Sequence, residues 1–163
     1  MTATRTETVP EFRLPASTGQ TLERDAFVGK VPMVISFHPG FSHEDTDRLV
    51  GSFNELLADF GSQRSQILMV VPETASEVRS YAERHGVRFP ILADPALEMA
   101  RAFDAVAAAD DSTMAPRPVL IITDPQGTIV RRFDEVPKEG QAQAALSVIR
   151  AEGSSWLDPS GEA

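Results

Sequence analysis

Two short runs of almost uninterrupted apolar residues stand out along the chain, and apolar residues at helical spacing follow the first of them. The runs are Val31–Phe37 and Ile67–Val71. Their lack of regular alternation with polar residues is typical of central strands that are covered on both faces of a sheet. The segment from Ser42 to Phe60 carries one apolar stripe and therefore predicts an amphipathic helix. The stripe consists of Leu49, Phe53, Leu56, Leu57 and Phe60.

The pattern continues with a second helix, expected over Thr74–His85. Gly86 is expected to end it, because glycine readily adopts the left-handed conformation found after many helices. Phe89–Leu92 predicts a short extended segment, and a further helix is expected over Pro95–Phe103. The next residues, Ala105–Thr113, predict either a loop or a short helical extension.

The C-terminal third begins with two β-branched runs, Val119–Thr123 and Ile129–Phe133. The tetrapeptide Asp124–Gly127 joins them, and its second-position proline and fourth-position glycine suit a type I turn, so the two runs predict a hairpin. A closing helix is expected over Glu139–Arg150. At the other end of the chain, residues 8–27 predict a short hairpin or edge strand around a polar turn.

The order of these elements predicts an α/β fold with a mixed β-sheet and helices on both faces. The first crossovers are long enough for parallel pairing, whereas the last two strands must be antiparallel. This is a thioredoxin-like arrangement. We expect one domain over residues 1–152, followed by a flexible C-terminal tail over 153–163, which is rich in Gly, Ser, Pro and Asp.

Charge and the absence of cysteine exclude several classes of function. The formal net charge of −9 disfavours nucleic acids and anionic membranes as partners, since binding to either needs clustered cations. The longest apolar runs are too short to span a bilayer, and the polar start lacks the apolar core of a secretory signal, so a cytoplasmic location is expected. The chain contains no cysteine, which excludes disulfides, thiolate metal sites and cysteine nucleophiles.

A catalytic or ligand-binding site is expected in the loop after the first central strand, because such sites in open α/β sheets form at the carboxyl ends of strands. The loop consists of His38, Pro39, Gly40, Phe41, Ser42, His43, Glu44, Asp45 and Thr46. Thr46 lies three positions before Leu49 and seven before Phe53 of the apolar stripe. We therefore expect Thr46 on the inward face of the first helical turn, near the positive end of the helix dipole.

Several segments, in collinear order over roughly residues 9–150, resemble the peroxiredoxin family. Phe37-His38-Pro39 matches the start of its signature, in which the proline is followed after three residues by threonine and after two more by the peroxidatic cysteine. Here His43 stands at the threonine position and Thr46 at the cysteine position. Phe89–Asp94 is similar to another family segment, and Arg117 precedes the predicted hairpin as the family's active-site arginine does.

The resemblance implies the peroxiredoxin version of the thioredoxin-like fold, similar to the alkyl hydroperoxide reductase (AhpC/TSA) and bacterioferritin-comigratory branches. It also leaves open a homodimer formed through the family's edge surfaces. A peroxiredoxin attacks peroxide with a thiolate of lowered pKa and passes through a sulfenic acid. A threonine hydroxyl is not appreciably ionised near neutral pH and has no such oxidation series, so we expect no thiol peroxidase activity.

Two interpretations of His43 and Glu44 remain open. In the first they transfer protons in catalysis, with Thr46 as a hydrogen-bonding group. In the second, Ser42 and Asp45 form a capping box at the start of the helix, and His43 and Glu44 are exposed in its first turn. We expect no metal site, because the separation of four residues between the two histidines of the loop matches no familiar ligand pattern. No cofactor is expected either.

Arg117 also has two interpretations. It would hold an anionic or oxygen-rich ligand near Thr46, or form an ion pair with one of the 24 acidic residues. Pro118 is a candidate for a cis peptide bond, since this fold often has one before that strand. Phe41 and Met114 are candidates to line an apolar pocket. The remaining candidate ligand-binding residues are Pro39, Ser42 and His38.

Two functions are consistent with these observations. The first is a repurposed small-molecule enzyme of a bacterial pathway, such as one for a specialised metabolite, that uses the ancestral pocket. The second is a catalytically dead homologue that acts as a binding or regulatory module. A pocket lined by His43, Thr46 and Arg117 would favour the first.

Overall fold

The chain folds around a five-stranded mixed sheet, seen in a computed structural model that describes residues 7–42, 45–108, 110, 112–135 and 140–157. Its strand order is β5-β4-β3-β8-β9. The bounds are β3 Met33–Phe37, β4 Gln66–Val71, β5 Ile91–Ala93, β8 Val119–Thr123 and β9 Ile129–Phe133. β3, β4 and β5 are parallel, whereas β8 is antiparallel to β3 and β9 is antiparallel to β8. The α/β thioredoxin-like fold expected from the sequence is confirmed.

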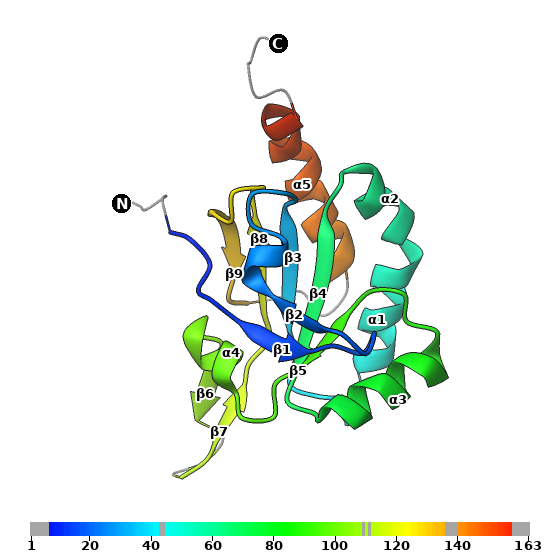
Figure 1. Cartoon of the computed structure of the whole chain (residues 1–163), viewed down its shortest axis with the longest axis vertical. Coiled ribbons are helices and arrows are strands. Elements are labelled where there is room, and N and C mark those ends of the chain that lie inside the picture. The colour runs from blue at the N-terminus through cyan, green and yellow to red at the C-terminus, as the bar shows by residue number, and fades with distance from the viewer. Residues whose placement is uncertain (1–6, 43–44, 109, 111, 136–139, 158–163) are drawn as a thin grey trace.

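Helices cover both faces of the sheet (Figure 1). One face carries α1 Thr46–Glu55, α2 Leu57–Ser62, α3 Ala75–His85 and α5 Gln141–Leu157. The other carries α4 Glu98–Ala102 and the N-terminal hairpin, formed by β1 Arg13–Pro15 and β2 Thr21–Glu23. Strand side chains alternate between the two cores, as the pleat requires: in β3, Val34 lies with α1 and α5, while Ile35 and Phe37 lie with α4.

The second predicted helix forms nearly as expected because both of its ends carry the right residues. Thr74 accepts a hydrogen bond from the Glu77 backbone N–H, and the Glu77 carboxylate accepts one from the Thr74 N–H, which completes a capping box. At the other end Gly86 adopts the left-handed conformation, with φ 62° and ψ 37°.

The first predicted helix differs from expectation in two ways. It begins at Thr46, with Asp45 as the N-cap residue and without a capping bond from the Asp45 side chain. Ser42 therefore does not cap it, and the predicted capping box over Ser42–Asp45 is wrong. The helix is also interrupted at Leu56, which ends α1 and precedes α2.

The segment after α4 is neither the loop nor the helical extension that the sequence suggested. β6, Val106–Ala108, pairs with β7, Met114–Pro116, as an antiparallel ribbon that projects from the body in Figure 1. The helix cannot continue because Asp104 takes a left-handed conformation, with φ 54°. Pro116 holds the opposing segment extended, so pairing overrides the helix propensity of the alanines.

The closing helix is longer than predicted. α5 ends at Leu157 rather than near Arg150, so residues 153–157 belong to the helix and not to a tail. Trp156 explains the difference, since it packs against the α5-side core. The bond before Pro118 is trans, because the described residues contain no cis peptide bond. No helix in the described part of the chain combines the length and apolar character needed to cross a membrane.

Candidate functional site

The predicted site loop begins where β3 ends. His38, directly after β3, donates its backbone N–H to the carbonyl of Val70 in β4. Its side chain is 5% exposed, on the same face as Val34 and therefore beneath α1. Thr46, the first residue of α1, is fully buried. The expectation that Thr46 lies on the inward face of the first helical turn is confirmed.

Three hydrogen bonds link His38, Gly40 and Thr46 in a closed ring. The Gly40 N–H donates to His38 Nδ1 at 3.1 Å, and the Thr46 hydroxyl donates to the Gly40 carbonyl at 2.8 Å. His38 Nε2 lies 3.5 Å from Thr46 Oγ1. Because Nδ1 is an acceptor here, a neutral imidazole carries its proton on Nε2 and donates it to the Thr46 oxygen.

This ring gives Thr46 a structural role. Its one proton is already used by the Gly40 carbonyl, and its oxygen accepts from His38. Among the described residues, the groups that contact this buried hydroxyl are one acceptor of its proton and one donor to its oxygen. The ring instead fixes the loop between β3 and α1.

Arg117 does not hydrogen-bond Thr46; among the described residues its guanidinium contacts Asp104 and Asp134. Nη2 donates to the Asp104 carbonyl at 2.8 Å, and Nη1 lies 3.0 Å from the Asp134 carboxylate. Val119, two positions later, belongs to the core on the α4 side, the face opposite Thr46. The ion-pair interpretation of Arg117 is therefore the one that the structure supports.

Arg132 completes this cluster. It donates to the Phe103 and Asp104 carbonyls at 2.6 Å each and to the Asp134 carboxylate at 3.0 Å. Partial burial alone would raise the pKa of Asp134, but the hydrogen bonds and charges of Arg132 and Arg117 outweigh it and lower that pKa. The cluster ties β9 to the end of α4 and to the base of the β6–β7 ribbon.

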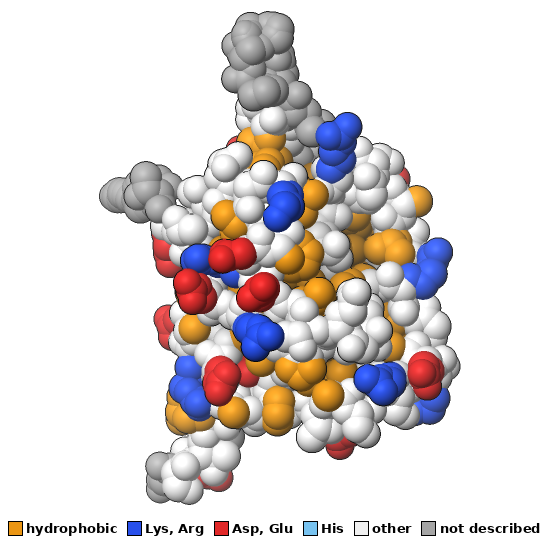
Figure 2. All heavy atoms as spheres, in the orientation of Figure 1, with side chains coloured by type: hydrophobic (Ala, Val, Ile, Leu, Met, Phe, Trp, Pro, Cys, Tyr) orange, Lys and Arg blue, Asp and Glu red, His pale blue; other side chains and the backbone are white. Residues whose placement is uncertain are grey.

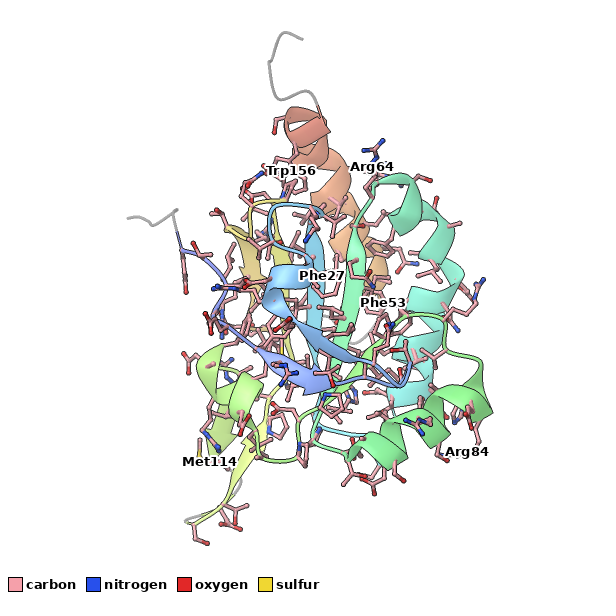
Figure 3. All side chains as sticks on the ribbon, in the orientation of Figure 1. Phe27, Phe53, Arg64, Arg84, Met114 and Trp156 are labelled. Carbon is pink, nitrogen blue, oxygen red and sulfur yellow. The ribbon has the colours of Figure 1, made fainter. Side chains whose placement is uncertain are left out.

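The other predicted residues are spread over different surroundings. His43 and Glu44 lie outside the described residues. Ser42 is exposed and Pro39 is half-buried. Phe41 stacks on Tyr81 of α3, with ring centroids 4.0 Å apart. Met114 lies on the projecting β6–β7 ribbon instead and is 46% exposed (Figure 3), so Phe41 and Met114 do not line a common pocket.

A carboxylate that the sequence analysis missed lies beside this loop. Glu73 follows the end of β4 closely, and its Oε2 accepts the Phe41 backbone N–H at 3.3 Å. Its Oε1 is buried and has no hydrogen-bond partner among the described residues. Burial is the main cause that raises the pKa of Glu73, with the charge of Glu77 adding to it, against the lowering effect of the Phe41 N–H.

Gly40 allows this carboxylate to come so close. A Cβ on Gly40 would lie 2.9 Å from Glu73 Oε2, and the φ of Gly40 is +137°. The sequence signal was present, because Glu73 follows the second central strand and the carboxyl ends of parallel strands share one edge of a sheet. Within the described residues, no group of three or more His, Cys, Asp or Glu is placed to hold a metal ion.

Comparison with known proteins identifies relatives in sequence and in structure. The model of the AhpC/TSA family matches residues 6–132. Peroxiredoxin Bcp from Xanthomonas campestris is 26% identical over 125 residues, which cover 73% of this chain and 76% of that relative.

Solved structures of peroxiredoxins share the fold of this chain. The bacterioferritin comigratory protein of X. campestris, known for alkyl peroxide reduction activity, superposes with a TM-score of 0.81 at 24% identity, covering 87% of this chain and 92% of that one. The peroxidoxin BcpB of Mycobacterium tuberculosis reaches a TM-score of 0.82 at 20% identity, covering 91% of this chain and 97% of that one. Since the family model matches most of the chain, the protein belongs to the AhpC/TSA family and is a peroxiredoxin-family member that contains no cysteine.

Proposed function

We propose that this chain is a non-catalytic peroxiredoxin homologue that uses the family fold as a binding module. The observation that carries the proposal is the ring of hydrogen bonds around Thr46. A group kept for catalysis has to present a lone pair or a proton to a substrate. Thr46 is fully buried, and its hydroxyl proton is held by the Gly40 carbonyl.

The arginine that follows β7 supports the same conclusion. A catalytic or anion-binding arginine presents free donors to its ligand. Two of the five N–H donors of Arg117 are instead directed at Asp134 and at the Asp104 carbonyl. An anion that needed the donor held by Asp134 would have to displace a carboxylate that two arginines contact.

The competing function, a small-molecule enzyme, has one observation in its favour. Glu73 is a carboxyl with a raised pKa and an unpartnered buried oxygen next to the site loop, which is a feature shared with general acids and bases. In that case Glu73, rather than Thr46, would be the group to test, together with His43 and Glu44.

Hydroperoxide consumption, with dithiothreitol as reductant, tests the proposal. The X. campestris peroxiredoxin Bcp serves as the positive control, and the wild type is expected to match the protein-free blank. Thr46→Cys places its thiol in a fully buried position, so we expect its rate to be at least about 100-fold below that of Bcp.

The same variant reports on access to the site. A thiol labelled by Ellman's reagent only after unfolding would agree with a closed site. Rapid labelling and rapid peroxide consumption by Thr46→Cys would show a site open to small substrates and would favour the enzyme. Peroxide consumption by the wild type would contradict the proposal itself.

A further inference from the structure

Two adjoining hollows lie along β1, and the second of them reaches the start of α3. One, of about 340 Å³, lies over β1 between the turn Arg24–Ala26 and α4. The other, of about 230 Å³, lies between the end of β1 and the starts of α3 and α4. Leu14 and Glu98 line both hollows. They therefore adjoin along β1, and we call the two hollows together the β1 groove.

In the part of the chain that the structure describes, one edge of β1 is unpaired along this groove. The Arg24 N–H donates to the Phe12 carbonyl, and the Ala16 N–H donates to the Gln20 carbonyl. In an antiparallel pair the hydrogen-bonded positions alternate, so Arg13, opposite Glu23, points its backbone N–H and carbonyl away from β2. β5 pairs with that edge only beyond Pro15, through an isolated antiparallel bridge between Ala16 and Leu92.

The charges around the groove favour a cation. Arg24 pairs with Glu11 and Asp25 at 3.5 and 3.2 Å, and Arg13 lies 3.9 Å from Glu23. Glu98, in the middle of the groove, forms no ion pair with any described residue. Figure 2 shows acidic and basic side chains gathered over β1, β2 and α4. Since the whole chain carries a net charge of −9, the long-range field also attracts cations.

The floor of the groove is apolar. Phe12, Leu14 and Met99 are buried beneath the larger hollow. The smaller hollow has small apolar walls, which include Ala75, Ala93 and Ala96. A hollow of that size admits aliphatic and aromatic side chains alike, so its walls favour an apolar residue without selecting its size.

We propose that the β1 groove binds an extended segment of a partner protein, which carries a lysine or arginine next to an apolar residue. The segment adds to the free edge of β1, its cation lies over Glu98, and its apolar side chain enters the smaller hollow. This inference rests on the proposed function, because it names the surface and the partner class of the binding module.

Selection from a random octapeptide display library, with the full-length chain as bait, tests the inference. We expect the selected peptides to share a basic residue next to an apolar one. Glu98→Gln should weaken binding of a selected peptide about three- to fivefold, the size of one partly exposed ion pair. Glu55→Gln is the matched control, since Glu55 is an exposed helical carboxylate on the opposite face.

Backbone amide NMR of the same complex locates the site. The Arg13 amide is expected to shift saturably with peptide. A selection without a basic preference, or binding that Glu98→Gln leaves unchanged, would overturn the inference. If lysine amide alone shifted the Arg13 amide as much as the peptide does, the groove would be assigned to small cations instead. Neither result depends on peroxide consumption, so failure here is distinguishable from failure of the proposed function.

Discussion

Replacing Thr46 by valine tests whether its hydroxyl is a structural group. Valine has nearly the same shape and the same branching at Cβ, so packing and helix propensity change little. What changes is that the Gly40 carbonyl loses its donor at 2.8 Å and His38 Nε2 loses its acceptor at 3.5 Å. The buried Gly40 carbonyl then has no donor among the described residues, and the His38 ring loses its contact with residue 46.

The expected cost follows from those two groups. A buried polar group left unsatisfied costs about 1–3 kcal/mol, and the longer contact to His38 belongs at the lower end. Thr46→Val should therefore reduce the free energy of unfolding by about 2–4 kcal/mol. Thr46→Ser keeps the hydroxyl and loses one buried methyl group, so it should cost only about 1 kcal/mol.

Urea unfolding of the three proteins provides the measurement. Trp156 is the only tryptophan, and it packs against the core to which α1 contributes, so its fluorescence reports on that core. A double-mutant cycle with His38→Phe separates the two bonds, since a coupling near zero would mean that the 3.5 Å contact contributes nothing. The reasoning is refuted if Thr46→Val is no more destabilising than Thr46→Ser.

Three other predictions use titrating groups. Because the pKa of Glu73 is raised in the folded protein, the folded state holds this proton more tightly than the unfolded state does. The resulting stabilisation is full below the ordinary pKa of 4.5 and is lost as pH rises through the raised pKa. Glu73→Gln should thus be more stable than wild type at pH 8, by less than about 1 kcal/mol, with no such gain at pH 4, as urea midpoints will show. For Asp134 the sign is opposite, because its pKa is lowered: Asp134→Asn should cost about 0.5–1 kcal/mol at pH 7, and the cost should shrink as acid protonates the wild-type carboxyl. Burial, and then the hydrogen bond to Asp47, raise the pKa of Tyr81, the only tyrosine, so its phenolate absorbance should appear well above pH 10; ionisation near pH 10 in folded protein would contradict this.

The elements that the sequence predicts well are those whose signal is local. Val31–Phe37 contains β3, and the helix expected over Thr74–His85, with Gly86 as its stop, places α3 to within a residue. The β6–β7 ribbon was missed because each of its strands is held by the other, and β7 lies outside residues 105–113, for which a loop or helix was expected. The Arg117 N–H donates to the Ala105 carbonyl, and nothing within residues 105–113 encodes that pairing.

The same distinction applies to the site. Apolar periodicity is enough to predict that Thr46 faces inward, because the information lies within one helix. The partner of Arg117 depends on β9 lying beside β8, which brings Asp134 to Arg117 from 17 positions away in the chain. A comparison of motifs predicts where that arginine lies in the chain, but it does not predict which carboxylate the arginine pairs with. The loss of the thiol and the pairing of this arginine are therefore independent observations, one from the sequence and one from the fold, and both point away from peroxide chemistry.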